Sequence, residues 1–365
     1  MAPTPREVAE TMLVNQAARA DRVPVPPGAE VTRLHQRIPG YRPTPLRSLT
    51  GVADDLGLAA VTMKDESDRF GLPAFKILGA TWAVERALHR RPATRTLVAA
   101  SAGNHGRAVA RCAAQRGLAC RIYLPAGTSA ERPSPIVAEG AEVVCVDGGY
   151  DQATRAARLG AREPGAALIA DFSPRPDAAS PAWVIEGYAT LFREAAAQLT
   201  EPVDLVLVPV GVGSLAAAAV RWAVHEGRRA RVVGVEPTAA ACVTASLRAG
   251  RPVTVPTPGT SMAGLNCATP SAVAWPTIRD GLAGTVTVGD PEVHEAMREL
   301  AALGLAIGDC GAAPLAALWR LASDDGCRPL RDAVGFAAGV RVLCIGTEGP
   351  TDIAAYRAVV ERPAR

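Results

Sequence analysis

The chain has 365 residues, of which 48% are hydrophobic and 21% charged, and its formal net charge is +3. This length and apolar content favour a large domain or two lobes with a shared core. The small net charge, with arginines spread along the chain, argues against a nucleic-acid-binding surface. A long uncharged segment, residues 205–220, is broken by Pro209, Gly211 and Gly213, which argues against a membrane span.

The eight cysteines occur singly, with no C-x-x-C pair and no spacing typical of zinc ligands, so we expect no metal site. The first residues, MAPTPREVAE, do not show the basic and then apolar segments of a secretory signal. Together these features favour a cytoplasmic protein whose cysteines are reduced and occupy small core positions.

Short β-branched segments alternate with segments rich in Ala and Leu. The predicted strands cover residues 96–100, 120–124, 142–146, 167–170, 205–208 and 231–235. The predicted helices cover residues 104–115, 129–139, 150–162 and 182–198, and further helices start at residue 214 and after residue 235. We expect a loop over residues 173–181 and an irregular connection over residues 251–264. Strands separated by helices predict βαβ units and parallel sheets flanked by helices.

The chain contains only two lysines, Lys64 and Lys76, against 37 arginines. Lys76 lies in an apolar segment, FGLPAFKILG, at residues 70–79. A desolvated amine can lose its proton and attack a carbonyl, whereas a guanidinium cannot. Lys76 is therefore a candidate for covalent chemistry; the alternative is a lysine whose stem packs on apolar surface. Lys64, in the strand-like segment VTMKDES, is interpreted as structural.

Ligands of parallel sheets bind in the loops after the strands, and the loop after the first predicted strand is rich in small residues. It consists of Ser101, Ala102, Gly103, Asn104, His105 and Gly106. Its free backbone amides and the helix that follows can hold an anion. The alternative is a tight turn in which a Ser or Asn caps the helix.

Two further loops carry polar groups after apolar strands. Gly211, Val212, Gly213 and Ser214 follow the strand DLVLVPV and could hold a phosphate; ordinary strand-to-helix packing also explains them. Thr347 follows the strand VRVLCI and offers a hydroxyl to a ring nitrogen; the alternative is a simple turn. A rare lysine, two anion-suited loops and a hydroxyl together suit an aldehyde cofactor that bears a phosphate, such as pyridoxal phosphate.

On these residues the chain resembles the fold-type-II, or tryptophan-synthase-β-like, pyridoxal-phosphate enzymes, and within them the diaminopropionate ammonia-lyase branch. The resemblance runs from about residue 41 to residue 352. The matching stretches are YRPTPL from Tyr41, KDESDRFGLPAFK from Lys64, GNHGR from Gly103, WVIEGYATL from Trp183 and TEGPTD from Thr347.

The resemblance implies two lobes, each with a mainly parallel sheet flanked by helices, in a homodimer. Residues 1–78 and 192–365 would form the large lobe, and residues 79–191 an inserted small lobe. A small amino acid would be the substrate, with no nucleic-acid or membrane partner.

The resemblance also assigns roles. Lys76 would bind the cofactor aldehyde and later move the α-proton. Gly211, Val212, Gly213 and Ser214 would hold the cofactor phosphate, and Thr347 would face the pyridine nitrogen. The loop of Ser101, Ala102, Gly103, Asn104 and His105 would bind the substrate carboxylate, with Asn104 also near the 3-hydroxyl and no separate role for His105.

The chain departs from the ammonia-lyase pattern at one of two acidic positions. Ala102 stands where the lyases have an aspartate, and the loop then reads Ser-Ala-Gly-Asn-His, as in serine and threonine dehydratases. Asp171 matches the second aspartate; its alternative role is that of a cap in a Ser/Pro-rich loop. One acid–base group is absent and one is present, which predicts activity toward a single stereoisomer, the L-form.

The expected activity is α,β-elimination from 2,3-diaminopropionate or a β-substituted relative, through an aminoacrylate, to a 2-oxo acid and ammonia. Serine/threonine dehydration and β-replacement on the same scaffold are the nearest alternatives. A protein that binds the cofactor or an amino acid without turnover is another. A nicotinamide-dependent dehydrogenase is the weakest, because residue 216 is Ala where its loop has a third glycine.

Overall fold

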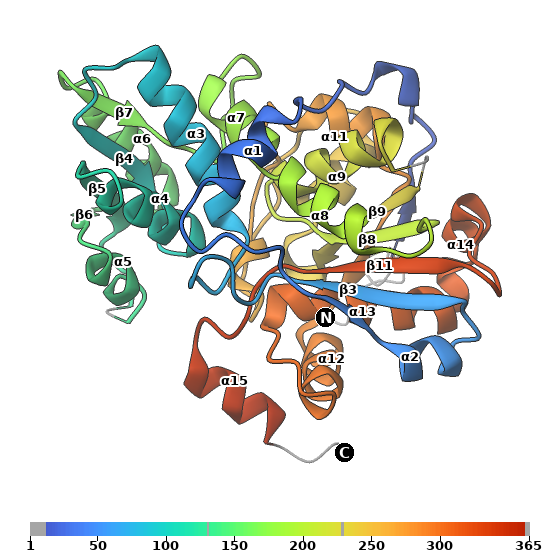
Figure 1. Cartoon of the computed structure of the whole chain (residues 1–365). Helices are drawn as coiled ribbons and strands as arrows, with labels where there is room; N and C mark the ends of the chain where they lie inside the picture. Colours follow the sequence, from blue (N-terminus) through green and yellow to red (C-terminus); the bar gives the residue numbers. More distant parts are fainter. Residues whose placement is uncertain (1–11, 130, 228–229, 362–365) are drawn as a thin grey trace.

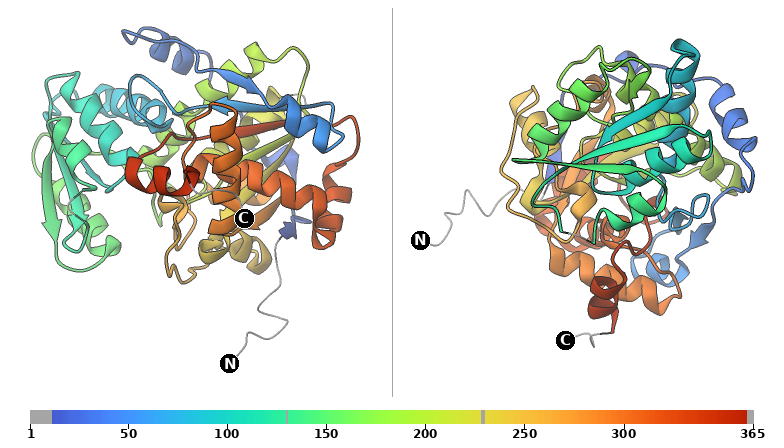
Figure 2. Two further views of the ribbon diagram at one scale, coloured as in Figure 1. Left: turned by 90° about the horizontal axis from the view of Figure 1, so that it is seen from below. Right: turned by 90° about the vertical axis from the view of Figure 1, so that its left-hand side faces the viewer.

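The computed structural model describes residues 12–129, 131–227 and 230–361. It contains a seven-stranded sheet in the order β1-β10-β9-β8-β11-β3-β2 and a four-stranded sheet in the order β6-β5-β4-β7. All pairs of neighbouring strands are parallel except β1 with β10 and β2 with β3, at the two edges of the larger sheet. The two sheets lie at opposite ends of the molecule, with helices around both (Figures 1 and 2).

The larger sheet consists of β1 (Met12–Val14), β2 (Leu46–Ser48), β3 (Ala60–Asp65), β8 (Leu205–Pro209), β9 (Arg231–Pro237), β10 (Gly284–Val288) and β11 (Arg341–Gly346). The smaller sheet consists of β4 (Thr96–Ala100), β5 (Ala119–Pro125), β6 (Glu142–Val146) and β7 (Ala166–Leu168).

The helices in the first half of the described chain are α1 (Glu30–Gln36), α2 (Thr50–Asp55), α3 (Lys76–Arg90), α4 (Asn104–Ala114), α5 (Ser134–Ala138), α6 (Tyr150–Gly160) and α7 (Ala179–Gly187). Those in the second half are α8 (Ala189–Gln198), α9 (Ser214–His225), α10 (Cys242–Ala249), α11 (Trp275–Gly281), α12 (Asp290–Ala302), α13 (Asp309–Ser323), α14 (Arg328–Val334) and α15 (Ile353–Val360). None of these helices combines the length and the apolar character that crossing a membrane requires.

The larger sheet is buried on both faces. Along β8, Val206 and Val208 pack into one hydrophobic cluster, whereas Leu205 and Leu207 pack into another. Because successive strand residues point to opposite faces, a strand covered on both sides is apolar throughout, as β8 is. The first cluster continues through α3, α4, α7 and α9 into the smaller sheet, so one core joins the two sheets. The second, on the other face, includes α12 and α13.

The α/β fold with parallel sheets is the one the sequence predicts, and several strands match their expected bounds closely. Three expectations about helices and loops are wrong. Residues 182–198 do not form one helix: α7 ends at Gly187 and α8 starts at Ala189. A Cβ at Gly187 would lie 2.7 Å from the carbonyl oxygen of Leu78, so α7 approaches α3 very closely before the chain turns. The loop expected over residues 173–181 is shorter because α7 begins at Ala179.

The third concerns residues 129–139, where the helix covers only Ser134–Ala138. Pro133 precedes it, and proline favours a helix start over a helix interior. Residue 130 of that expected helix lies outside the described residues. The cysteines mostly occupy core positions as expected, but Cys145 is exposed on β6.

The smaller sheet and α4–α6 lie within residues 79–191, and α3 runs across the expected boundary at residue 78. The division of the chain into lobes at these residues stays a prediction.

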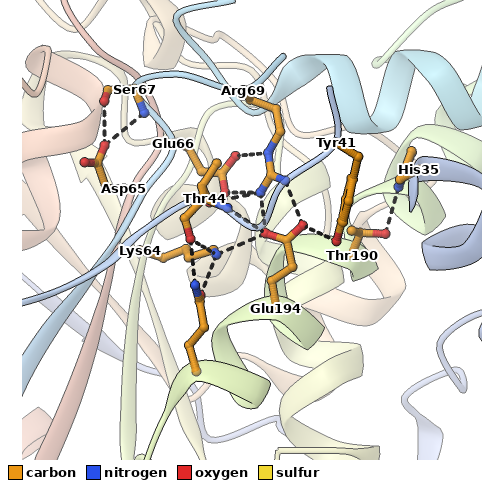
Figure 3. A network of polar contacts seen from close by, with 11 residues as sticks. His35, Tyr41, Thr44, Lys64, Asp65, Glu66, Ser67, Arg69, Thr190 and Glu194 are labelled. Carbon is orange, nitrogen blue, oxygen red and sulfur yellow. Dashed lines mark hydrogen bonds and ion pairs between the residues drawn. The ribbon is translucent and has the colours of Figure 1, made fainter. Parts of the chain in front are cut away.

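A buried network of charges lies beside the segment that leads to Lys76 (Figure 3). The guanidinium of Arg69 contacts the carboxylates of Glu66, 2.8 Å from Nε, and of Glu194, 2.7 Å from Nη1. Lys64 Nζ lies 3.0 Å from Glu194 Oε2 and donates to the carbonyl of Thr44 at 2.6 Å. All four charged side chains are at most 3% exposed. Lys64 therefore has the structural position that the sequence suggested.

The network fixes one end of a tight turn. Arg69 N donates to Leu72 O at 2.8 Å, and Leu72 N donates back to Arg69 O at 3.1 Å. Phe70 and Gly71 between them both have positive φ, 57° and 72°, and Phe70 is the one non-glycine residue in the described chain with such a backbone. This conformation costs a bulky side chain free energy, so it needs firm support from its surroundings. Lys76 begins α3 four residues after Leu72.

Candidate functional site

The predicted site residues meet where the loops after β4, β7, β8 and β11 surround the start of α3. The Lys76 ammonium donates to Asp171 Oδ2 at 3.0 Å, and the two side chains are 22% and 15% exposed. These residues are 95 positions apart. The structure therefore brings together the two residues that the sequence singled out as catalytic.

The ion pair has opposite effects on its two members. Burial alone would lower the pKa of Lys76, but the interactions with Tyr188 and Asp171 outweigh it and raise that pKa above its ordinary value. Burial would raise the pKa of Asp171, and the neighbouring His105 and Lys76 lower it below its usual range instead. Both groups are therefore charged at neutral pH as long as they face each other.

The loop after β4 is a tight turn that opens α4. A Cβ at Gly106 would lie 2.2 Å from the carbonyl oxygen of Ser101, so only glycine fits there. Gly103 N donates to Ser101 Oγ at 3.3 Å, and Gly103 is exposed. Ala102 is half-buried and packs against the core. No polar atom of its side chain replaces the aspartate that the lyase pattern has at this position.

Asn104 and His105, the first residues of α4, point to different partners. Asn104 Nδ2 donates to Glu348 Oε2 at 2.6 Å. His105 Nε2 lies 3.0 Å from the carbonyl of Ile169, which can only accept, so Nε2 carries a proton. His105 Nδ1 has no hydrogen-bond partner within the described residues and lies 3.9 Å from Asp171 Oδ2. His105 is thus a neighbour of the ion pair, which the sequence did not predict.

The loop after β8 brings backbone amides close to the same place. Gly213 has a φ of 94°, and a Cβ there would lie 2.2 Å from Ile278 Cδ1. A Cβ at Gly211 would lie 3.0 Å from both Cys267 Sγ and Gly264 O. The half-buried Val212 separates the two glycines, and Ser214 begins α9 and donates its hydroxyl to the carbonyl of Asp171 at 3.0 Å. The start of a helix with free amides suits an anion such as a phosphate.

Thr347 lies next to the start of α3. Its carbonyl accepts a hydrogen bond from Phe75 N at 3.2 Å, directly before Lys76. Its hydroxyl is buried and has no hydrogen-bond partner within the described residues. A buried polar atom without a partner is uncommon and indicates a group that a ligand can satisfy.

The model of the family described as "Pyridoxal-phosphate dependent enzyme" matches residues 38–336. The chain belongs to this family. Diaminopropionate ammonia-lyase of Salmonella typhimurium is 34% identical to it over 370 residues, with 91% of each chain covered. L-threonine ammonia-lyase of Geobacter sulfurreducens is 30% identical over 332 residues, 90% of this chain and 76% of the relative.

Solved structures agree with this family. A crystal structure of diaminopropionate ammonia lyase from Escherichia coli, in complex with an aminoacrylate–PLP azomethine reaction intermediate, has a TM-score of 0.87 and 31% identity. The structural match covers 96% of this chain and 96% of that one. The fold is thus that of the fold-type-II pyridoxal-phosphate-dependent enzymes, as the sequence predicted.

The residues present fit the cofactor of this pyridoxal-phosphate-dependent family. The unpartnered hydroxyl of Thr347 suits the ring nitrogen, the Gly211–Ser214 loop suits the phosphate, and the amine of Lys76 suits the aldehyde.

Two residues of the site escaped the sequence analysis. Glu348 is buried, follows Thr347 and contacts Asn104. Tyr188 is buried between α7 and α8, and its ring lies 4.8 Å from that of Phe75. It is close enough to Lys76 for each group to shift the pKa of the other. Both belong to stretches that carry the resemblance, TEGPTD and WVIEGYATL, but no local pattern indicates which way their side chains point.

Proposed function

We propose that this chain is a pyridoxal-phosphate-dependent ammonia-lyase that acts on 2,3-diaminopropionate or a close β-substituted relative. The observation that carries the proposal is the Lys76–Asp171 ion pair beside the amides that open α9. The identity of 34% to a diaminopropionate ammonia-lyase over 91% of the chain supports the substrate class. In the reaction the α-proton and the β-amine leave, and hydrolysis then releases the second amine as ammonia and leaves pyruvate.

The bound cofactor supplies an aldehyde that joins the substrate amine and a ring that withdraws electrons from the α-carbon. The chain's own residues would hold and orient it: Gly211, Val212, Gly213 and Ser214 at the phosphate, Asn104 at the 3-hydroxyl and Thr347 at the pyridine nitrogen. A neutral hydroxyl at that nitrogen, unlike a carboxylate, does not favour its protonation. The weaker electron withdrawal that results suits loss of a β-substituent better than transamination.

Lys76 and Asp171 would handle the protons. Once Lys76 is uncharged, Asp171 loses one of the two neighbours that lower its pKa; burial still raises that pKa, and His105 alone then opposes the effect of burial. The carboxylate becomes able to accept or give a proton next to the α-carbon, while the loop of Ser101, Ala102, Gly103, Asn104 and His105 holds the substrate carboxylate. His105 Nδ1 lies 3.9 Å from the same oxygen of Asp171, too far for a hydrogen bond, and is a second nitrogen beside the carboxyl group.

The alanine at position 102 restricts which stereoisomer is used. With Asp171 on one side and no acid at Ala102, we expect pyruvate release from L-2,3-diaminopropionate and little from the D-isomer. Measuring pyruvate from each isomer separately tests this, with Ala102→Asp as the matched variant that restores the second carboxyl. Equal rates on both isomers in the unchanged enzyme would overturn the single-stereoisomer proposal.

Serine/threonine dehydration is the second candidate, because Ser101 and Ala102 give the loop the dehydratase sequence and a threonine ammonia-lyase is 30% identical. A panel of serine, threonine and other β-substituted amino acids, with and without added nucleophiles, separates dehydration, ammonia loss and β-replacement. If no member of the panel releases a 2-oxo acid or gives a replacement product, the chain is a binding protein instead.

We further infer a cytoplasmic homodimer, in which residues 79–191 form the small lobe of each subunit. The resemblance to the family supports this arrangement. Light scattering on the purified holoenzyme tests the dimer, and limited proteolysis near residues 78 and 191 tests the lobe boundaries.

A further inference from the structure

Glu348 is a carboxyl group of the site that the proposed function leaves without a role. It is 9% exposed and follows Thr347 in the segment after β11. Ala74, two residues before Lys76, forms an isolated β-bridge with it. Glu348 is therefore tied by its backbone to the start of α3 and by its side chain to Asn104 at the start of α4.

The hydrogen bond from Asn104 Nδ2 to Glu348 Oε2 is short, 2.6 Å, and joins residues 244 positions apart. Within the described part of the chain, the Asn104 side chain makes no other hydrogen bond. An amide has a donor end and an acceptor end of nearly equal shape, so the partner it meets decides which end points where. Here the carboxylate holds the nitrogen end.

The surroundings of Glu348 make this contact strong. Burial raises the pKa of Glu348, while the Cys310 thiol and the Asn104 amide act in the opposite direction by hydrogen bonding. In a site with little water, a hydrogen bond between an amide and a carboxyl group is stronger than the same bond in solvent.

We propose that Glu348 is a positioning residue: it fixes the orientation of the Asn104 amide and so sets the hydrogen bond that Asn104 offers to the 3-hydroxyl of the cofactor. The inference rests on the place that the proposed function gives Asn104. It adds a residue that acts through Asn104 and touches neither the substrate nor the reacting atoms.

The visible spectrum of the bound cofactor and its dissociation constant test this without any substrate. The 3-hydroxyl is part of the chromophore that absorbs at about 410–430 nm, so a freely rotating Asn104 changes the intensity of that band. We expect Glu348→Ala to weaken that band and to raise the cofactor dissociation constant roughly 10-fold, the effect of losing one buried hydrogen bond. Glu348→Gln keeps an oxygen that can accept from Asn104, so it should keep most of the band intensity and most of the affinity for the cofactor.

A double-mutant cycle with Asn104→Ala isolates the coupling. If Glu348 acts through Asn104, the double variant binds the cofactor no more weakly than Asn104→Ala alone. Additive losses would overturn the proposal, and so would an unchanged band in Glu348→Ala. Cys310→Ala removes a second side chain that hydrogen-bonds Glu348 and serves as the matched control, with a spectrum like that of the unchanged protein.

Folding is followed by circular dichroism in every variant, and Glu348→Gln keeps the test decisive if Glu348→Ala does not fold. Failure of the proposed function has a different signature. In that case the unchanged enzyme releases no pyruvate from any β-substituted amino acid, whatever the Glu348 variants do to the spectrum.

Discussion

Two buried polar clusters lie on either side of the tight turn at residues 69–72, and they differ in how fully their atoms are paired. In the network of Arg69, Lys64, Glu66 and Glu194, positive and negative charges balance, and the Arg69 guanidinium donates at all three of its nitrogens (Figure 3). Around Lys76, the hydroxyl of Thr347 and Nδ1 of His105 have no hydrogen-bond partner within the described residues.

The difference in hydrogen-bond pairing indicates that the first cluster stabilises the fold and that the second binds ligands. A buried charged group destabilises the folded state unless it is paired and hydrogen-bonded. A group whose hydrogen bonds are all made within the protein has none left for a ligand. Unpaired polar atoms beside a partly exposed ion pair are what a cofactor and a substrate can complete. Changes in the first cluster should therefore alter stability, and changes in the second should alter turnover.

The largest effect is expected at Lys76. Lys76→Ala removes the amine and should lower pyruvate release by about 10⁴-fold or more, the upper end of the loss for a group that also moves protons. Lys76→Arg is the matched control, because it keeps a positive charge beside Asp171 yet cannot act as a nucleophile. Both variants should also lack a borohydride-sensitive visible band. An active Lys76→Arg enzyme would show that Lys76 supplies only its charge.

Asp171→Asn should lower kcat by about 10²–10⁴-fold, the loss typical of a missing acid–base group, with little change in the denaturant midpoint. Asp177→Asn is the control in the same loop, since Asp177 is largely exposed and pairs with Arg175 at the surface. Steady-state kinetics and urea unfolding on both variants decide the matter. If Asp171→Asn instead lowers stability and leaves kcat unchanged, Asp171 stabilises the fold and takes no part in proton transfer.

Arg69→Met leaves the carboxylates of Glu66 and Glu194 without their main partner and should lower the free energy of unfolding by about 3–5 kcal/mol. Arg42→Met removes an exposed ion pair with Asp68, whose side chains are 75% and 55% exposed, and should cost about 1 kcal/mol or less. Denaturant unfolding measures both. Equal losses would contradict the structural role of the network.

His35, on α1, makes stability depend on pH outside the active site. Burial lowers its pKa from 6.5 to about 4; Nε2 lies 3.0 Å from Leu78 O and Nδ1 2.8 Å from Thr190 Oγ1. The unfolded chain then binds a proton more readily than the folded one. Stability is complete above pH 6.5 and falls as the pH decreases toward 4, by up to about 3 kcal/mol. His35→Gln should flatten this part of the curve of unfolding free energy against pH; an unchanged slope would exclude His35 as its source.

Local pattern accounts for what was predicted correctly. The parallel sheets follow from apolar strands such as β8 that alternate with Ala-rich helices, and Lys76 stands out because the chain uses arginine almost everywhere else. The break at Tyr188 between α7 and α8 was missed because the sequence of residues 182–198 does not reveal that Gly187, directly before it, packs closely on α3. The roles assigned to Asn104, Ser214 and Thr347 stay predictions, although the structure places all three around Lys76.

By itself the sequence determined the fold class and the family and singled out Lys76, because periodicity, composition and motifs are properties of neighbouring residues. Only the tertiary structure decided which side chains meet. Lys76 pairs with Asp171 across 95 positions, and Asn104 pairs with Glu348 across 244. Such pairs form because packing brings loops from separate strands of two sheets to one place, and no local pattern records which of their side chains will face each other.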